Sequence, residues 1–136
     1  GIDYSSDCVA WSSAYNEEWI KEGRVEILQA SVNKLPFQDN FFDIVTAVET
    51  VYFWPNLTEC FGEIKRVLKP SGKFVIINEV YKSELFRERN EAYAAASDMQ
   101  IFAPEELKQW LEELEFKNVT TAVVEANNWL CCIGEK

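Results

Sequence analysis

Two stretches of the chain are nearly continuous runs of apolar, strand-forming residues, and they limit the folds that the sequence can adopt. They are residues 43–48 (DIVTAV) and 73–80 (KFVIINEV). A strand that is apolar throughout, instead of alternating with polar residues, is typical of a parallel sheet with helices on both faces. The sequence therefore predicts an α/β fold in which both segments are buried strands.

Helical patterns separate the predicted strands. The apolar residues between 57 and 68 fall on one stripe, and Asn56 with Glu59 forms a capping pair at its start. A second helix is predicted from Pro104, which suits the first helical position, to Leu114. A third begins at Ser5 or Ser6 and ends at Gly23, a residue type that favours helix ends. Residues 83–98 are also predicted to be helical.

Three further strands complete the predicted order of elements: 25–28, 119–125 and 129–133, the last two joined as a hairpin through Asn127 and Asn128. Strands that alternate with helices indicate a mostly parallel sheet, here with an antiparallel C-terminal strand. Since 136 residues is an ordinary domain length, we predict a single domain over residues 1–136.

Composition excludes several functions. A share of 14% aromatic residues is too high for a disordered chain, and the formal net charge of -10 argues against a nucleic-acid partner. No apolar run approaches the roughly 20 residues of a membrane span, so we expect no membrane partner.

The chain has no histidine, which removes histidine-based triads and most catalytic zinc sites, and we predict no metal site. Its four cysteines form no CxxC pair. We interpret them as reduced thiols of a cytoplasmic protein. They are Cys8, Cys60, Cys131 and Cys132.

Several motifs occur in an order and spacing that resemble those of class I S-adenosylmethionine-dependent methyltransferases, in particular the small-molecule branch called type 11. They are GIDYS at residues 1–5, ASV at 30–32, LPF at 35–37, DNFFDIV at 39–45 and RVLKPSGK at 66–73. The resemblance extends over residues 1–133. It implies a Rossmann-like sheet, S-adenosylmethionine as the cofactor, and a small-molecule methyl acceptor.

The resemblance also implies roles for residues at strand ends, where ligands bind in open parallel sheets. Asp3 would accept hydrogen bonds from the two ribose hydroxyls. Ser31 stands where similar proteins have an aspartate for the adenine amino group, and Val32 would contribute its backbone NH. The backbone around Ala47 would border the sulfonium end of the cofactor.

A general base, if the acceptor needs one, must come from a carboxylate or a phenol because histidine is absent. Glu49, Tyr52 and Glu79 follow predicted strands and are the candidate catalytic residues. Tyr52 also begins a run of three aromatic residues that could surround a methyl sulfonium. Residues 81–102 are expected to form a lid or a wall of the pocket.

The family's glycine-rich loop and the first central strand before it have no counterpart in the sequence, so we expect the first central strand to be missing. Its loss would leave unpaired strand edges, which a second copy of the chain could cover in a homodimer. The alternative to an enzyme is therefore a catalytically silent fragment, or an oligomerisation-dependent core, that does not bind the cofactor alone. A short-chain dehydrogenase is disfavoured because no tyrosine is followed by lysine four positions later.

Overall fold

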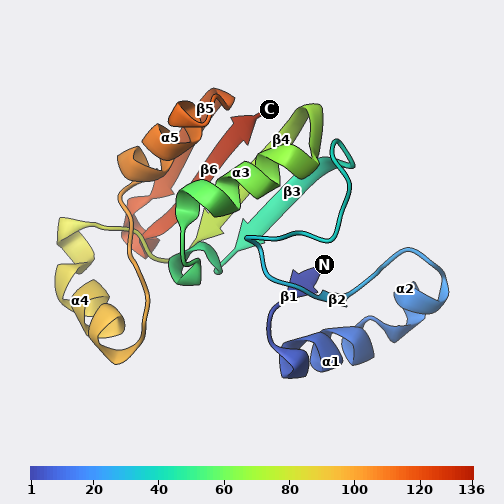
Figure 1. Ribbon diagram of the computed structural model, residues 1–136. Helices are drawn as coiled ribbons and strands as arrows, with labels where there is room; N and C mark the ends of the chain where they lie inside the picture. The colour runs from blue at the N-terminus through green and yellow to red at the C-terminus, as the bar shows by residue number, and fades with distance from the viewer. The chain divides into compact units, whose positions relative to one another are not determined.

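The computed structural model describes residues 1–136, which form two units, residues 1–36 and residues 37–136 (Figure 1). Each unit has a sheet of its own. The prediction of a single domain over residues 1–136 stays a prediction. The α/β class and the Rossmann-like mixture of parallel and antiparallel strands are confirmed.

The first unit consists of a small parallel sheet and two helices. Strand β1 (Ile2–Asp3) pairs with β2 (Leu28–Gln29), and helices α1 (Ser6–Tyr15) and α2 (Glu17–Lys21) lie between them in the sequence. The Ser5 hydroxyl caps α1 by accepting the Cys8 N–H at 3.4 Å, as the sequence predicts.

Two predictions for this unit are corrected. The helix expected up to Gly23 is broken at Asn16, whose side-chain amide donates to the Ser12 carbonyl at 2.8 Å and competes with helix continuation. The strand expected at 25–28 begins only at Leu28, because the Val25 N–H bonds back to the Trp19 carbonyl in α2. Gly23 does end the helical segment, with a left-handed φ of 70°.

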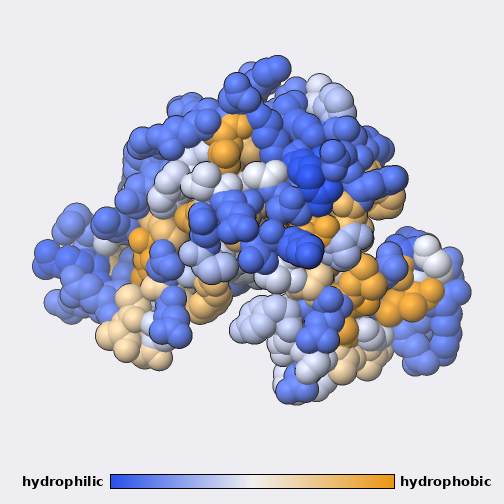
Figure 2. Space-filling model, viewed as in Figure 1, coloured by the Kyte–Doolittle hydropathy of each residue, from blue (hydrophilic) through white to orange (hydrophobic).

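The aromatic side chains of this unit do not pack together into a buried core. Trp11 is 76% exposed and Tyr15 is 91% exposed, although their spacing places them on one side of α1. Figure 2 shows further hydrophobic residues at the surface of residues 1–36.

The second unit contains a four-stranded sheet in the order β3-β4-β6-β5. Strand β3 (Phe42–Val48) runs parallel to β4 (Leu68–Asn78), and β6 (Trp129–Glu135) runs antiparallel to both β4 and β5 (Lys117–Val124). A 3-10 turn, Glu125–Asn127, closes the β5–β6 hairpin, with Asn128 in the left-handed region at a φ of 61°. The predicted antiparallel C-terminal pair is confirmed.

Two helices cover one face of this sheet (Figure 1). Helix α3 (Leu57–Val67) packs on β4, and α5 (Pro104–Glu113) packs on β5 and β6. Asn56 caps α3 by accepting the Glu59 N–H at 3.3 Å, as predicted. The apolar residues between helices and sheet are fully or almost fully buried; they are Phe61, Ile64, Val67, Phe74, Ile76, Leu107, Leu111, Leu130 and Cys132. This layer is the core of the unit.

The opposite face of the sheet corrects the expectation that helices cover both sides. Ile44 is 58% exposed, Val48 is 50% exposed, and Ile77, which pairs with Val48, is 41% exposed. Both helices that pack on the sheet in residues 37–136 lie on the other face, so the apolar run of β3 is only half covered.

Strand β4 begins at Leu68, five residues earlier than predicted, and the helix α3 leads straight into it. Ser71 takes a left-handed φ of 63° at this point. A Cβ on Gly72 would lie 2.8 Å from the Lys69 carbonyl oxygen, so only glycine allows the backbone to approach so closely.

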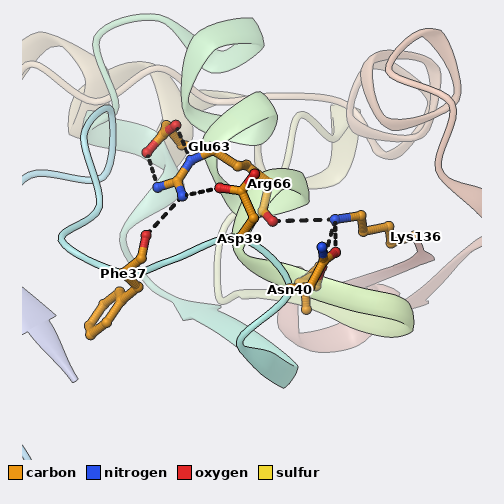
Figure 3. A network of polar contacts seen from close by, with 7 residues as sticks. Phe37, Asp39, Asn40, Glu63, Arg66 and Lys136 are labelled. Carbon is orange, nitrogen blue, oxygen red and sulfur yellow. Dashed lines mark hydrogen bonds and ion pairs between the residues drawn. The ribbon is translucent and has the colours of Figure 1, made fainter.

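A polar network ties the loop before β3 to α3 and to the end of β6 (Figure 3). Arg66 donates two hydrogen bonds to the Glu63 carboxylate, one to Asp39 and one to the Phe37 carbonyl, all at 2.8–2.9 Å. The Lys136 ammonium donates to the Leu68 carbonyl at 2.7 Å. The RVLKP segment therefore fixes the entry into β3 and the start of β4.

The remaining elements follow the carboxyl ends of β3 and β4. They are the 3-10 turns Val51–Phe53 and Glu84–Phe86 and the helix α4 (Arg87–Ala96), which begins four residues after the predicted start at 83. None of the helices has the length and apolar character that crossing a membrane requires.

Candidate functional site

Two glutamates meet where the parallel strands β3 and β4 end. Glu49 follows β3, and its N–H donates to the Ile77 carbonyl of β4 at 2.9 Å. Glu79 follows β4, and its N–H donates to the Glu49 carboxylate. The carboxyl group of Glu49 is thus fixed above the end of the neighbouring strand, as expected for a site at the carboxyl edge of a parallel sheet.

The buried side chain of Tyr52 holds the Glu49 carboxylate and the end of β4 in place. Its hydroxyl oxygen accepts the Val80 N–H at 3.0 Å and lies 3.3 Å from Glu49 Oε1 and 3.2 Å from the Val80 carbonyl oxygen, the two acceptors for its proton. The side chain is 1% exposed. Burial raises the pKa of the Tyr52 hydroxyl well above its usual range, and the charges of Glu49 and Glu79 add to this effect. Tyr52 therefore stays protonated at neutral pH and acts as a donor.

Glu49 has an unusual backbone conformation. Its φ is 56°, in the left-handed region that non-glycine residues rarely occupy. Such a conformation costs on the order of 1–2 kcal/mol and persists only where surrounding contacts compensate for it. Here the Tyr52 hydroxyl and the Glu79 N–H supply those contacts.

An open pocket of about 380 Å³ lies beside these residues. Its walls combine two carboxylates, one guanidinium and several apolar or aromatic side chains. The lining residues are Glu49, Glu79, Val80, Arg89, Tyr93, Met99, Asn127 and Trp129. The residues between 81 and 102 supply three of them, which agrees with their predicted role as a wall of the pocket.

Buried amides hold this wall against the sheet. Asn90 of α4 donates to the Tyr81 carbonyl at 2.7 Å, and Asn128 of the β5–β6 turn donates to the same carbonyl at 3.0 Å. The Gln100 N–H donates to the Tyr52 carbonyl at 2.9 Å. Because Asn90 and Asn128 are buried, these bonds set the position of α4 relative to β6.

Sequence reasoning placed Glu49, Tyr52 and Glu79 at this rim, and the structure brings them together. It missed Arg89, Asn127 and Trp129. For Arg89 a signal existed, because Phe86 and Tyr93 stand three residues before it and four residues after it. That spacing places two rings and one cation on the same side of a helix.

The predicted cofactor residues of the first unit also lie close together. Asp3 ends β1 and pairs with Gln29 of β2, and its carbonyl accepts the Ala30 N–H at 3.0 Å. Ser31 and Val32 follow Ala30 directly, so they lie at the same sheet edge as Asp3. Oδ1 of Asp3 accepts the Ser5 N–H at 2.8 Å, while Oδ2 remains available to a diol. The donor and acceptor chemistry at this edge fits a ribose and an adenine amino group.

Ala47 belongs to the second unit and pairs with Ile76 of β4. Its side chain is 4% exposed, on the face that α3 covers, so only its backbone remains for a ligand. No cluster of three or more histidine, cysteine, aspartate or glutamate side chains is arranged to hold a metal ion.

Residues 1–76 match a family model described as a methyltransferase domain. Among curated proteins, the chain is similar to the sterol 4-C-methyltransferase strm-1 of Caenorhabditis elegans, with 35% identity over 81 residues, 57% of this chain and 24% of that protein. It is also similar to the ubiquinone/menaquinone biosynthesis C-methyltransferase UbiE of Stutzerimonas stutzeri, with 31% identity over 60% of this chain and 29% of that protein. The chain thus spans about a quarter of the length of these relatives.

Among solved structures, the fold is similar to that of a chain in a complex between the Haloferax volcanii Trm112 methyltransferase activator and a methyltransferase. The TM-score is 0.84 at 18% identity, over 99% of this chain and 70% of the other. At that identity the likeness concerns the fold.

Proposed function

The chain belongs to the family of methyltransferase domains, and from this membership we propose that it takes part in S-adenosylmethionine-dependent methyl transfer to a carbon atom of a small, largely apolar acceptor. The observation that carries the proposal is the family match over residues 1–76. The names of the two curated relatives, both C-methyltransferases, support carbon as the acceptor atom. The apolar side chains of Val80, Met99 and Trp129 in the pocket support an apolar acceptor.

The residues of the first unit would hold the cofactor. Asp3 would accept the ribose hydroxyls through Oδ2, Ser31 would accept from the adenine amino group, and Val32 would offer its backbone N–H. When bound, S-adenosylmethionine supplies a methyl group on a sulfonium, a cation that is already activated for transfer.

The rim of the second unit would serve the acceptor. Glu49 takes the proton that the acceptor carbon loses once the new bond has formed, and Tyr52 with the Glu79 N–H holds the Glu49 carboxylate in place. Glu79 is exposed and acts by its charge at the rim. Tyr52 is thus a positioning residue in this proposal, because its hydroxyl is buried and stays protonated.

Calorimetric titration of S-adenosylhomocysteine tests the cofactor part. We expect heat of binding with the 136-residue chain or with a polypeptide extended upstream of Gly1. Binding should be about tenfold weaker for Asp3→Asn, which keeps an oxygen for the Ser5 N–H but loses the charge. Asp7→Asn, a charge change in the first turn of α1, is the matched control. No binding by either polypeptide would contradict the proposal and favour a catalytically silent core, the alternative that the family match does not favour.

We also propose that a second copy completes the sheet. Strand β3 ends the order β3-β4-β6-β5, so one of its edges is unpaired in this sheet, and the exposed Ile44 and Val48 flank that edge. Thr46→Lys should shift a dimer to monomer in sedimentation velocity. Thr120→Lys, on the same face of β5 at the other edge, should not. A monomer at all concentrations would contradict this part.

The state of the four thiols supports a cytoplasmic location. All four cysteines are free, and such thiols persist in a reducing compartment.

A further inference from the structure

Arg89 stands in the wall of the pocket, and its guanidinium contacts two aromatic rings. The central carbon of the guanidinium lies 4.3 Å from the centroid of the Phe86 ring and 5.6 Å from that of Tyr93. Cation–π contacts of this kind fix the plane of the guanidinium without using its N–H donors. The donors therefore remain for another group.

Only one hydrogen bond within the chain uses a donor of the Arg89 guanidinium. Its Nη2 donates one long bond of 3.4 Å to Asn90 Oδ1, and its Nε is buried without a partner. The other three arginines each pair with a carboxylate: Arg24 with Glu22, Arg66 with Glu63 and Asp39, and Arg87 with Glu84. In a chain with 23 acidic residues, an arginine that pairs with none of them stands out.

A buried donor without a partner costs free energy, and a guanidinium fork matches the two oxygens of a carboxylate. Glu49 and Glu79 line the same pocket, so a second negative charge on the ligand would be repelled. We propose that Arg89 binds the single carboxylate of an otherwise apolar ligand, whose body contacts Tyr93, Met99 and Trp129. This inference rests on the proposed function, because it makes the methyl acceptor an apolar monocarboxylic acid.

The contacts of Asn90 keep this arginine in place. Asn90 is buried and bonds to the Tyr81 carbonyl, and its Oδ1 also accepts from Asn128 at 3.3 Å. The backbone of α4 next to Arg89 is therefore fixed in position, and the site is preorganised for its ligand.

Calorimetry with two probes of the same shape tests the proposal: 2-naphthoate, which carries a carboxylate, and the neutral 2-naphthamide. We expect naphthoate to bind the chain about tenfold more tightly than the amide. Arg89→Gln should remove this preference, and Arg89→Lys should restore part of it, because the charge returns without the fork. Arg87→Gln, two residues away with a carboxylate partner, should keep the full preference.

Trp129→Ala locates the probes in the pocket. It should weaken both probes equally, because it removes apolar contact and leaves Arg89 intact. Equal binding of the two probes to the unaltered chain, or an unchanged preference in Arg89→Gln with an unaltered melting temperature, would overturn the proposal. If Arg89→Gln does not fold, the comparison of Arg89→Lys with Arg87→Gln decides in the same way.

Titration with S-adenosylhomocysteine separates this inference from the proposed function. Naphthoate selectivity without S-adenosylhomocysteine binding would keep the anion site and remove the methyltransferase role. Binding of S-adenosylhomocysteine without naphthoate selectivity would keep the methyltransferase role and remove the anion site at Arg89.

Discussion

The hydroxyl of Tyr52 lies 3.3 Å from Oε1 of Glu49, three residues earlier in the chain. The left-handed φ of Glu49 and the 3-10 turn that follows bring the two together above the end of β4. The same hydroxyl accepts the Val80 N–H, so one buried phenol connects the ends of both parallel strands. The position of the rim carboxylate thus depends on a residue that is itself inaccessible to ligand.

Tyr52→Phe should destabilise the protein by about 1–3 kcal/mol, because it leaves the buried Val80 N–H without its acceptor. The free energy of unfolding in urea measures this. Tyr15→Phe changes a side chain that is 91% exposed and should have little effect. Equal stability of the two variants would contradict the role given to the Tyr52 hydroxyl.

The protein should lose stability as the pH rises above about 9. Burial raises the pKa of Cys132 to about 12 and raises the pKa of the Tyr52 hydroxyl and of the Cys60 thiol. Above the pKa values of the unfolded chain, these groups lose protons more readily when unfolded, so the unfolded state becomes favoured. Below those pKa values the groups are protonated in both states, and their full contribution to the free energy of unfolding is present.

Urea unfolding at a series of pH values between 8 and 11 measures this loss. The free energy of unfolding should fall less steeply with pH in Tyr52→Phe, which removes one of the contributing groups. A free energy of unfolding that stays constant or rises over this range would contradict the interpretation.

Local signals predicted those parts of the fold that depend on neighbouring residues. The stripe of α3 and its cap at Asn56 are such signals, and both are confirmed. The break of the first helix at Asn16 depends on one side-chain hydrogen bond that competes with the helix. The spacing of the apolar residues contains no signal of this break. The uncovered face of β3 depends on which helices pack on the sheet, and an apolar run cannot tell one covered face from two.

In the candidate site, too, some residues could be placed from local sequence signals, and others depend on packing between distant segments. Glu49 and Glu79 could be placed at one rim because each follows a parallel strand, and such strand ends meet at one edge. Arg89 and Trp129 are 40 residues apart, and they line one pocket because buried amides tie α4 to the β5–β6 turn. No pattern in either segment alone encodes that contact.

Two glycines should respond to alanine in opposite directions. Gly72→Ala places a Cβ 2.8 Å from the Lys69 carbonyl and 3.2 Å from the Asp43 carbonyl, so we expect a loss of about 1–3 kcal/mol. Gly62 lies within α3 with open space around its Cα, and Gly62→Ala should stabilise the protein by about 0.5–1 kcal/mol. Thermal unfolding of both variants measures the difference. A Gly72→Ala variant as stable as the original chain would show that β4 can shift to admit a side chain.

The four thiols should react with Ellman's reagent in a fixed order. Cys8 is partly exposed and should react first, and Cys131, also partly exposed, should follow more slowly because burial raises its pKa. Cys60 and Cys132 are fully buried in the core and should react only when the protein unfolds. Single Cys→Ser variants assign each phase, and labelling in urea, where all four should react together, is the control. Rapid labelling of Cys132 in the folded protein would mean that α5 does not close over β6 as the structure has it.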